Sequence, residues 1–497
     1  MSLDIDVKTA KTGFFHFPKL FYAVLSIEFC ERFAFYGFQA VAVLYFTQKF
    51  QMTESASSDL FASFSALLYA MLSVGGITGD KFIGIRRTYL LGILFLIVGY
   101  GLLSLVQTEH YLYYAIGIIL VGNILFKTNA NNYVGRCFES NDPRLDSAFT
   151  YFYMSINMGS LFSMIIVPII SKVFDYKTGL MLNMISMIVA FVFYIIFKSR
   201  FRLADNNTGK NGSNLLIKIL IVVVVGSVLA YLLGIMLSHS KLSTIFLYLF
   251  AGIVIAIYLF TASRCNHKEA KGMYVALILI AFAILFYLLY MQQATSMTLF
   301  ALHNVRLNIL GFDVPAGVTQ ALNPFFVVFL SPLLANLYMK LHKDKVNYTI
   351  PAKFLTGIFL TGICFITLAI AAQFSADNNS QVSVAWMFLA YAFFSIGELL
   401  VSAIGPSMVV QLLPKRFGGF AQGIWFLSSA IGIKTGGQLS SYVAMDTVKD
   451  VAPNVILHSY INFFYKLGIV IFIIVMVLSF SVKSLNKAIN DITSHKY

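Results

Sequence analysis

The chain has 497 residues, of which 59% are hydrophobic, 15% aromatic and only 11% charged. A soluble protein of this length needs far more charge to cover its surface, so the composition indicates a polytopic membrane protein. The formal net charge of +14 fits basic cytoplasmic loops. A nucleic-acid partner is disfavoured, because outside the membrane spans the sequence has no basic patch interleaved with aromatic residues.

Residues 1–19 are polar and basic and run directly into an apolar segment, which indicates a cytoplasmic N-terminus and not a cleavable signal peptide. A bilayer core of about 30 Å needs about 20 apolar residues per helix. On that basis we predict an all-α protein with about fourteen transmembrane helices, because barrel strands would be shorter and would alternate. The candidate spans cover residues 20–48, 58–79, 88–107, 111–137, 147–173, 179–198, 215–236, 243–262, 272–300, 317–341, 350–374, 383–412, 419–445 and 458–482.

The loops that share a side with the N-terminus carry most of the Lys and Arg residues. Lys81, Arg86 and Arg87 lie between the second and third candidate spans, and similar groups follow in every second loop. The positive-inside rule therefore predicts that both termini are cytoplasmic.

The spans divide into six, two and six. The polar, Asn- and Gly-rich stretch "FKSRFRLADNNTGKNGSN", 197–214, predicts an exposed linker, and the apolar hairpin after it carries no recognisable chemistry. Two six-helix halves fit transporters built from two related bundles around a central site. The predicted divisions are a cytoplasmic N-terminus at 1–19, a six-helix bundle at 20–198, a linker and inserted hairpin at 199–271, a second bundle at 272–482 and a cytoplasmic tail at 483–497.

Few charges lie well inside the candidate spans. Such residues cost about 2.5–3.5 kcal/mol each on insertion scales, and they usually face a cavity and mark a transport pathway. The alternative is that these charges form salt bridges that only hold helices together. A set with both signs of charge on several helices disfavours this alternative. The set is Glu28, Glu31, Arg32, Lys127, Glu398 and Lys434.

The first span places its charges on one face. At about 100° per residue, Glu28, Glu31, Arg32, Phe35 and Gln39 fall within a stripe about 100° wide, which must face protein or water. All eight histidines lie in loops or at span ends, so carboxylates would have to carry any proton. The proton affinity of the two acids would depend on which of them pairs with Arg32.

Seven segments, in order along nearly the whole chain, resemble proton-dependent oligopeptide transporters of the major facilitator superfamily. The first, "EFCERFAFYG" at 28–37, resembles the ExxER signature of that family's first helix. The others are "VGGITGDKFIGIRRTYLLG" at 74–92, "GNILFKTNANNYVG" at 122–135, "FTYFYMSINMGS" at 149–160, "QALNPFFVVFLSPL" at 320–333, "SIGELLVSAIGPSMV" at 395–409 and "RFGGFAQGIWFLSSA" at 416–430.

The resemblance implies the major facilitator fold and a proton-coupled symporter that imports di- and tripeptides by alternating access. The extra hairpin is a feature of bacterial members, so it implies a multi-pass protein of the bacterial inner membrane. We expect a monomer in the lipid bilayer that needs no cofactor besides the proton gradient. The segment at 74–92 is similar to the facilitator loop, whose motif residues would be Gly76, Asp80, Lys81, Gly84, Arg86 and Arg87.

The resemblance also implies roles at a site for zwitterionic peptides. Arg32 and Lys127 would bind the carboxylate end, and Glu28 and Glu31 with Arg32 would couple the proton. In the empty site Lys127 would pair with Glu398 and link the two halves. The ammonium end and the backbone amides would contact Glu398, Asn157 and Asn323; side-chain pockets would be lined by Tyr36, Tyr69, Trp425 and Ser429, although core packing is an alternative for the aromatic residues.

Three positions depart from the family pattern. Gln39 stands where relatives often have Arg, and Gln292 stands where they often have Glu; that pair can close the outer side in relatives. We expect a Gln39–Gln292 hydrogen bond in place of the ion pair, which would make a weaker gate. Phe35 replaces a tyrosine and removes one hydroxyl from the site.

Other interpretations remain open at this stage. The departures leave room for a carrier of another zwitterion, a peptide-like drug or a metal chelate, and a non-transporting sensor is a more distant alternative. An enzyme is disfavoured because no nucleophile–base or metal constellation is present; the four cysteines lack CxxC or CxxH spacing, which disfavours zinc and disulfides. Lys434 lies about 180° from Trp425 around its helix, and we interpret it as a snorkelling or inter-helix lysine.

Overall fold

The structure, a computed structural model, describes residues 17–138, 142, 144–204, 214–309, 311–343, 348–378, 380–443 and 453–493. Most of the predicted N-terminal segment, the middle of the predicted linker and the last residues of the predicted tail lie outside the described residues.

Six long helices form the first half. α1 packs on α5 and α6, α3 packs on α4 and α6, and α2 packs on α4. Their bounds are α1 (Lys19–Phe50), α2 (Glu54–Ile77), α3 (Ile85–Leu105), α4 (Glu109–Arg136), α5 (Leu145–Val173) and α6 (Tyr176–Ile196).

The start of the predicted linker is a short helix, α7 (Lys198–Ala204). Its Phe201 is fully buried and contacts the rings of Tyr89, Tyr133 and Tyr194. Most side chains of this part are exposed, as the prediction of an exposed linker requires, but Phe201 anchors it to the first half.

The inserted hairpin consists of α8 (Leu215–Ser238) and α9 (Ser240–Ser263). α8 packs along α4, and α9 contacts α2, α10 and α16 (Gly418–Ser440). Leu216 is 79% exposed and Leu249 63% exposed, and a row of such side chains suits contact with lipid.

The second half contains longer helices that are interrupted within two of the predicted spans. α10 (His267–Tyr290) and α11 (Ser296–Asn304) are separated by the 3₁₀ turn η3 (Met291–Gln293), and α14 (Val384–Val401) and α15 (Gly405–Leu412) by a short turn. The remaining helices are η4 (Ala316–Ala321), α12 (Leu322–Lys343), α13 (Ile350–Asp377), η5 (Lys415–Phe417), α17 (Pro453–Ser479) and α18 (Val482–Thr493).

Among the described residues, four two-residue strands lie in the connections of this half. β1 (Val305–Arg306) pairs in parallel with β4 (Val382–Ser383), and β2 (Asn308–Ile309) pairs antiparallel with β3 (Phe312–Asp313). α18 packs on α10, where Lys271 Nζ lies 2.7 Å from Asp491 Oδ2.

Twelve spans in the described residues are long and apolar enough to cross a membrane, against about fourteen predicted from the apolar run lengths. α1 and α16 have 32 and 23 residues, but polar side chains interrupt them. Both are surrounded by other helices: α1 contacts α5 and α6, and α16 contacts α2 and α10. The described residues form an almost entirely helical membrane protein with two bundles and an inserted hairpin, as predicted.

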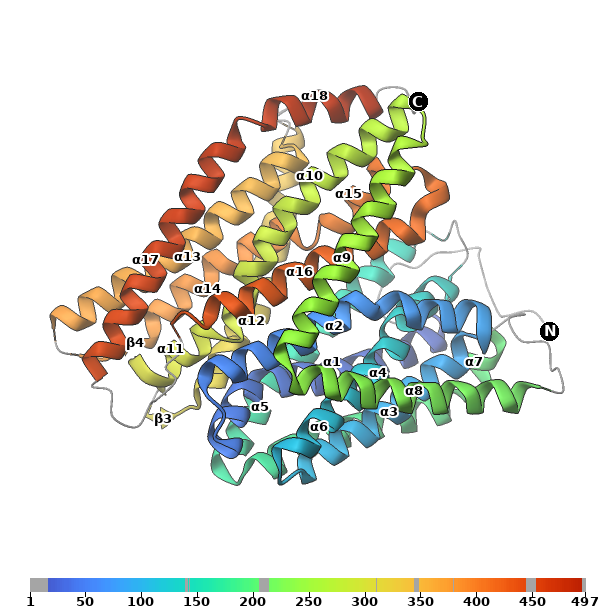
Figure 1. The fold of residues 1–497 in the computed structure, drawn as a ribbon, viewed down its shortest axis with the longest axis horizontal. Helices are drawn as coiled ribbons and strands as arrows, with labels where there is room; N and C mark the ends of the chain where they lie inside the picture. Colours follow the sequence, from blue (N-terminus) through green and yellow to red (C-terminus); the bar gives the residue numbers. More distant parts are fainter. Residues whose placement is uncertain are drawn as a thin grey trace.

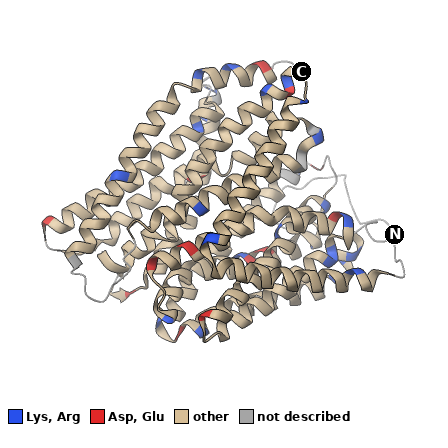
Figure 2. Ribbon diagram, in the orientation of Figure 1, with Lys and Arg blue, Asp and Glu red and all other residues tan. Residues whose placement is uncertain are grey.

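The two bundles meet at one end of the molecule. Figure 1 shows them together near α11, β3 and β4 and diverging toward the side where both chain termini are marked. We call these the far end and the terminal end. Figure 2 shows long uncharged stretches of helix, with most Lys, Arg, Asp and Glu residues near helix ends.

Hydrogen bonds cross the bundle interface at the far end. Lys172 Nζ donates to the Asp313 carbonyl oxygen at 3.0 Å, and His303 Nε2 lies 2.5 Å from Glu54 Oε1. The far end is therefore closed by contacts between the halves.

Candidate functional site

The charges of α1 form one buried cluster. Glu28, Glu31 and Arg32 are all buried, with Glu31 0% exposed. Arg32 Nε lies 3.2 Å from Glu28 Oε1, and the same guanidinium also contacts the Glu31 carboxylate. The i, i+3 and i+4 spacing places the three side chains on one face, as the sequence predicted.

The cluster is incompletely satisfied. Glu28 Oε2 and Glu31 Oε1 are buried and have no hydrogen-bond partner among the described residues. One guanidinium faces two carboxylates, so the three side chains carry a net charge of −1 when both acids are ionised. A single proton would neutralise this cluster, which is the chemistry expected of a coupling site.

Lys127 of α4 faces the same region from a second helix. Its Nζ lies 4.6 Å from the ring centroid of Tyr69 and 5.7 Å from that of Phe35. The Arg32 guanidinium lies 5.4 Å from the Phe35 centroid. Two cations thus lie over one aromatic ring, and the Phe35 ring presents them with an apolar surface that carries no hydroxyl.

The acidic residue of the predicted site, Glu398, belongs to the second half. Asn323 Nδ2 of α12 donates to Glu398 Oε2 of α14 at 2.6 Å and lies 3.3 Å from Ser395 Oγ. The Arg32 guanidinium of the first half lies 6.0 Å from the ring centroid of Tyr36. The predicted cationic groups therefore lie on the first half and the predicted anionic group on the second.

The predicted Lys127–Glu398 ion pair is not formed in this structure. Within the described part of the chain, the ion pairs do not include one between these two residues. Each residue has contacts within its own half: Lys127 with Tyr69, and Glu398 with Asn323. The predicted cationic group Lys127 and the predicted anionic group Glu398 are consequently not paired with each other in this state.

The other residues predicted to line the site differ in the solvent exposure of their side chains. Tyr69 is half-buried and stacks on Phe426 with ring centroids 6.3 Å apart, and Asn157 donates to the Tyr153 carbonyl oxygen at 2.9 Å. Both Trp425 and Ser429 are buried on α16.

Trp425 fits the alternative of core packing. Its ring lies 5.9 Å from Tyr287 and 6.4 Å from Phe354, and a side chain at Gly405 would overlap it. Its predicted role in a side-chain pocket stays a prediction.

The predicted Gln39–Gln292 hydrogen bond is wrong for this structure. Gln39 Nε2 donates to Gln320 Oε1 at 3.3 Å, and Gln292 Nε2 donates to the Gly436 carbonyl oxygen at 2.8 Å. Ser296 Oγ donates to Gln292 Oε1 at 2.7 Å. Gln39 does bridge the two halves, but toward η4, because Gln292 is held by α16 of its own half.

The facilitator loop motif surrounds the turn between α2 and α3. Gly84 has φ 88°, a conformation that favours glycine. The Arg87 guanidinium donates to the Ile83 carbonyl oxygen at 2.9 Å. The motif residues Gly76, Asp80, Lys81, Gly84, Arg86 and Arg87 all lie in or beside this turn.

Sequence reasoning missed Asp59, which pairs with Lys434. Lys434 Nζ lies 2.6 Å from Asp59 Oδ1, so the interpretation of Lys434 as an inter-helix lysine is confirmed. Asp59 is only the second residue of its predicted span at 58–79, so it was counted with the loop. Its spacing of four residues from Ser63 was the signal that could have identified it.

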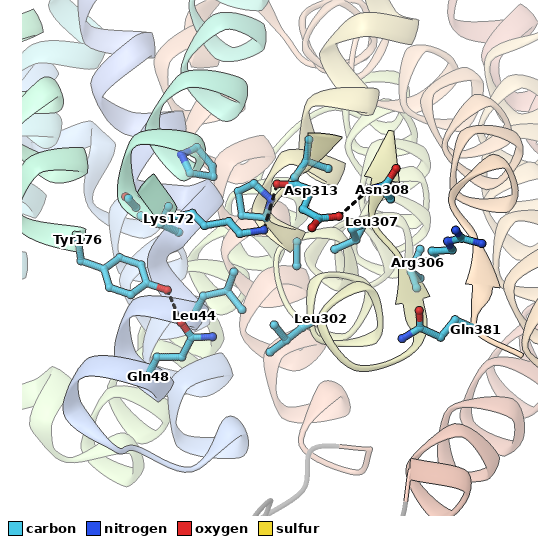
Figure 3. Close-up of a pocket in the computed structure, with 17 residues that line it drawn as sticks. Leu44, Gln48, Lys172, Tyr176, Leu302, Arg306, Leu307, Asn308, Asp313 and Gln381 are labelled. Carbon is cyan, nitrogen blue, oxygen red and sulfur yellow. Dashed lines mark hydrogen bonds between the residues drawn. The ribbon is translucent and has the colours of Figure 1, made fainter. Parts of the chain in front are cut away.

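A cavity of about 770 Å³ lies between the halves at the far end. Figure 3 shows Lys172, Tyr176 and Gln48 on one side and Arg306, Asn308 and Asp313 on the other. The charges of the predicted site do not line it. Among the described residues no group of three His, Cys, Asp or Glu side chains could hold a metal ion.

The comparisons with known proteins agree with this architecture. The sequence model of the POT family matches residues 86–457. The chain is 37% identical over 491 residues to dipeptide and tripeptide permease B of Xenorhabdus bovienii, covering 97% of this chain and 99% of that protein. It is 36% identical over 486 residues to the protein of the same name from Salmonella typhimurium, covering 97% and 98%.

Two solved structures share the fold along nearly their whole length. A bacterial homologue of the human drug peptide transporters PepT1 and PepT2 matches with a TM-score of 0.81 at 30% identity, covering 95% of this chain and 99% of that one. Tetrameric PepTSo2 matches with a TM-score of 0.83 at 30% identity, covering 94% and 98%.

Proposed function

Because this chain belongs to the POT family of transporters, we propose that it imports di- and tripeptides together with protons, by alternating access between its two bundles. It is a transporter and not an enzyme.

The observation that carries the proposal is the separation of opposite charges across the two halves. Arg32 and Lys127 of the first half would bind the peptide carboxylate, and Glu398, oriented by Asn323, would bind the ammonium group. A peptide that binds both poles would bridge the halves. Substrate binding would then favour the state in which the bundles approach each other at the terminal end.

The α1 cluster supplies the proton step. With both acids ionised, Arg32 is held by Glu28 and Glu31. Protonation of one acid weakens that hold and lets the guanidinium donate to a peptide carboxylate. Proton and peptide would thereby each favour the binding of the other, as coupled transport requires.

The terminal end is proposed to face the cytoplasm of a bacterium, with the protein in the inner membrane. The distribution of Lys and Arg among the loops supports this orientation, and it makes the structure an inward-facing state closed on the outside. One chain contains every residue named for transport, so we propose a monomer as the working unit.

Another small zwitterion is the second candidate cargo. It is favoured by the neutral residues Gln39 and Gln292 at the positions where relatives often carry an ion pair, and by the lost hydroxyl at Phe35. These residues alter the far-end gate and the surface between the two cations.

The test is uptake of labelled dialanine and trialanine into liposomes that contain the purified protein. An inward proton gradient is imposed and then collapsed with a protonophore. Uptake above equilibrium that disappears with the gradient supports proton–peptide symport. If folded protein takes up neither peptide, the peptide cargo is refuted and a panel of other zwitterions and chelates follows.

A further inference from the structure

The strongest unassigned feature is a buried charge pair at the interface between the bundles. Lys434 is 0% exposed in the last third of α16. Its ammonium group lies 2.6 Å from Asp59 Oδ1 and 2.7 Å from Ser63 Oγ, and both acceptors belong to α2. The described charge compensation of Lys434 therefore comes from the opposite half, which is expected of a contact that depends on conformation.

The inserted hairpin contributes two further hydrogen bonds to the residues around this pair. Ser240 Oγ of α9 donates to Asp59 Oδ2, the oxygen that Lys434 does not use. Ser243 Oγ lies 3.2 Å from Ser63 Oγ. Both acceptor side chains of α2 are thus held from one side by α9 and from the other by α16.

α8 of the hairpin is anchored to the first half, whereas α9 also packs on the second half, where the buried Tyr258 hydroxyl donates to the Met273 carbonyl oxygen of α10 at 2.7 Å. α8 approaches α4 so closely that a side chain at Gly117 or Gly234 would overlap the other helix. Tyr231 of α8 stacks on Tyr114 of α4 with ring centroids 5.1 Å apart. By contrast, α9 reaches α16 through the Tyr248 hydroxyl, 3.0 Å from Thr435 Oγ1. Opening of the far end would break the Tyr248 contact and leave the contacts of α8 with α4, while Tyr258 holds the other end of α9 to the second half.

Close packing restricts the pair to the closed far end. α2 and α16 are in extensive contact, and a side chain at Gly437 would overlap Ala62. Asp59 lies near the start of α2 and lines a cavity of about 650 Å³ beside the α8–α9 turn. Separation of α2 from α16 at this end would part the two charges and admit water to both.

We propose that Asp59 and Lys434, with Ser240 and Ser243 of the hairpin, form an outer latch that keeps the far end closed in the inward-facing state. The inserted hairpin then has a function: its α9 helix orients the Asp59 carboxylate toward Lys434. The proposal rests on alternating access in the proposed function but is independent of the cargo.

The test measures the far-end distance in purified protein in lipid nanodiscs without peptide. Spin labels are attached to cysteines at Lys177 in the first half and Tyr442 in the second, which are both exposed. The partly exposed native Cys137 and Cys265 are changed to serine, and the buried cysteines are left. Pulsed electron resonance gives the fraction of molecules with a long, open distance.

Asp59→Asn should raise the open fraction by about tenfold, because Lys434 is left buried without its anion. Asp59→Asn combined with Lys434→Met should return the fraction toward that of the parent protein, since neither charge remains. Ser240→Ala with Ser243→Ala should raise it by about fivefold. Ser263→Ala, at the other end of α9, where the hydroxyl bonds its own helix, is the matched control and should change nothing.

An unchanged open fraction in Asp59→Asn would overturn the latch. A double charge variant that stays as open as Asp59→Asn alone would also overturn it, because the effect of Asp59 would then not depend on Lys434. If the charge variants shift the distance and the serine variant does not, the role of the hairpin is wrong. Since no peptide is present, these results stand whether or not dialanine is transported.

Discussion

Replacement of Glu31 by glutamine is the sharpest test of the coupling cluster. In the structure Arg32 is shared by Glu28 and Glu31, so the ionised cluster carries a net charge of −1. Glu31→Gln keeps the shape of the side chain and sets the net charge at zero without a proton. The variant therefore mimics the protonated carrier permanently, and we expect it to bind and exchange peptide without using the gradient.

The size of the effect follows from the energy of one proton. A difference of one pH unit stores about 1.4 kcal/mol per proton, which corresponds to about tenfold accumulation of a neutral zwitterion. The parent protein in liposomes should approach that ratio for dialanine at one pH unit. Glu31→Gln should stay near a ratio of about one under the same gradient.

The assay compares accumulation with counterflow in the same preparation. Counterflow exchanges labelled peptide against internal unlabelled peptide and needs no net proton movement, so it should persist in Glu31→Gln and prove that the variant is folded. Glu109→Gln is the matched control, because Glu109 is exposed at the start of α4 and should accumulate peptide normally. Accumulation by Glu31→Gln equal to that of the parent would refute the coupling role.

Three further predictions concern binding, gating and folding. Lys127→Ala should abolish uptake and counterflow alike, because the carboxylate of the peptide loses one of its two cations; counterflow at parental rates would contradict this. Gln39→Ala and Gln320→Ala should couple by about 0.5–1.5 kcal/mol in a double-mutant cycle of thermal stability, whereas Gln39→Ala and Gln292→Ala should be additive. Gly84→Ala should destabilise the protein by about 1–2 kcal/mol, because φ is 88° there, and an unchanged melting temperature would argue against strain.

The sequence predicted best those features that one helix determines alone. Glu28, Glu31 and Arg32 share a face because helical periodicity places them there, whatever surrounds α1. The apolar run lengths similarly predicted the helices of both bundles. The exceptions are local: Phe201 draws the start of the linker into the first half, and η3 interrupts a predicted span.

Partners across the bundle interface could not be predicted in the same way. The Gln39–Gln292 bond was expected, yet Gln39 meets Gln320, and Lys434 meets Asp59 at a separation of 375 residues. Periodicity gives the face of each helix but not how far one half is rotated against the other. A change of conformation also changes these partners, so one sequence specifies more than one set of contacts across the interface.

The distribution of satisfied charges explains why this state can accept a substrate. In the centre, Arg32 is held by two acids of its own helix, and Glu398 is held by Asn323 of its own half. A peptide that enters from the terminal end therefore need not first break an ion pair between the bundles. The contacts that do cross the interface, such as Lys434 with Asp59, lie toward the far end. Closure around a peptide and release of the far end are thus physically separate events, and the coupling between them must pass through the rigid bundles themselves.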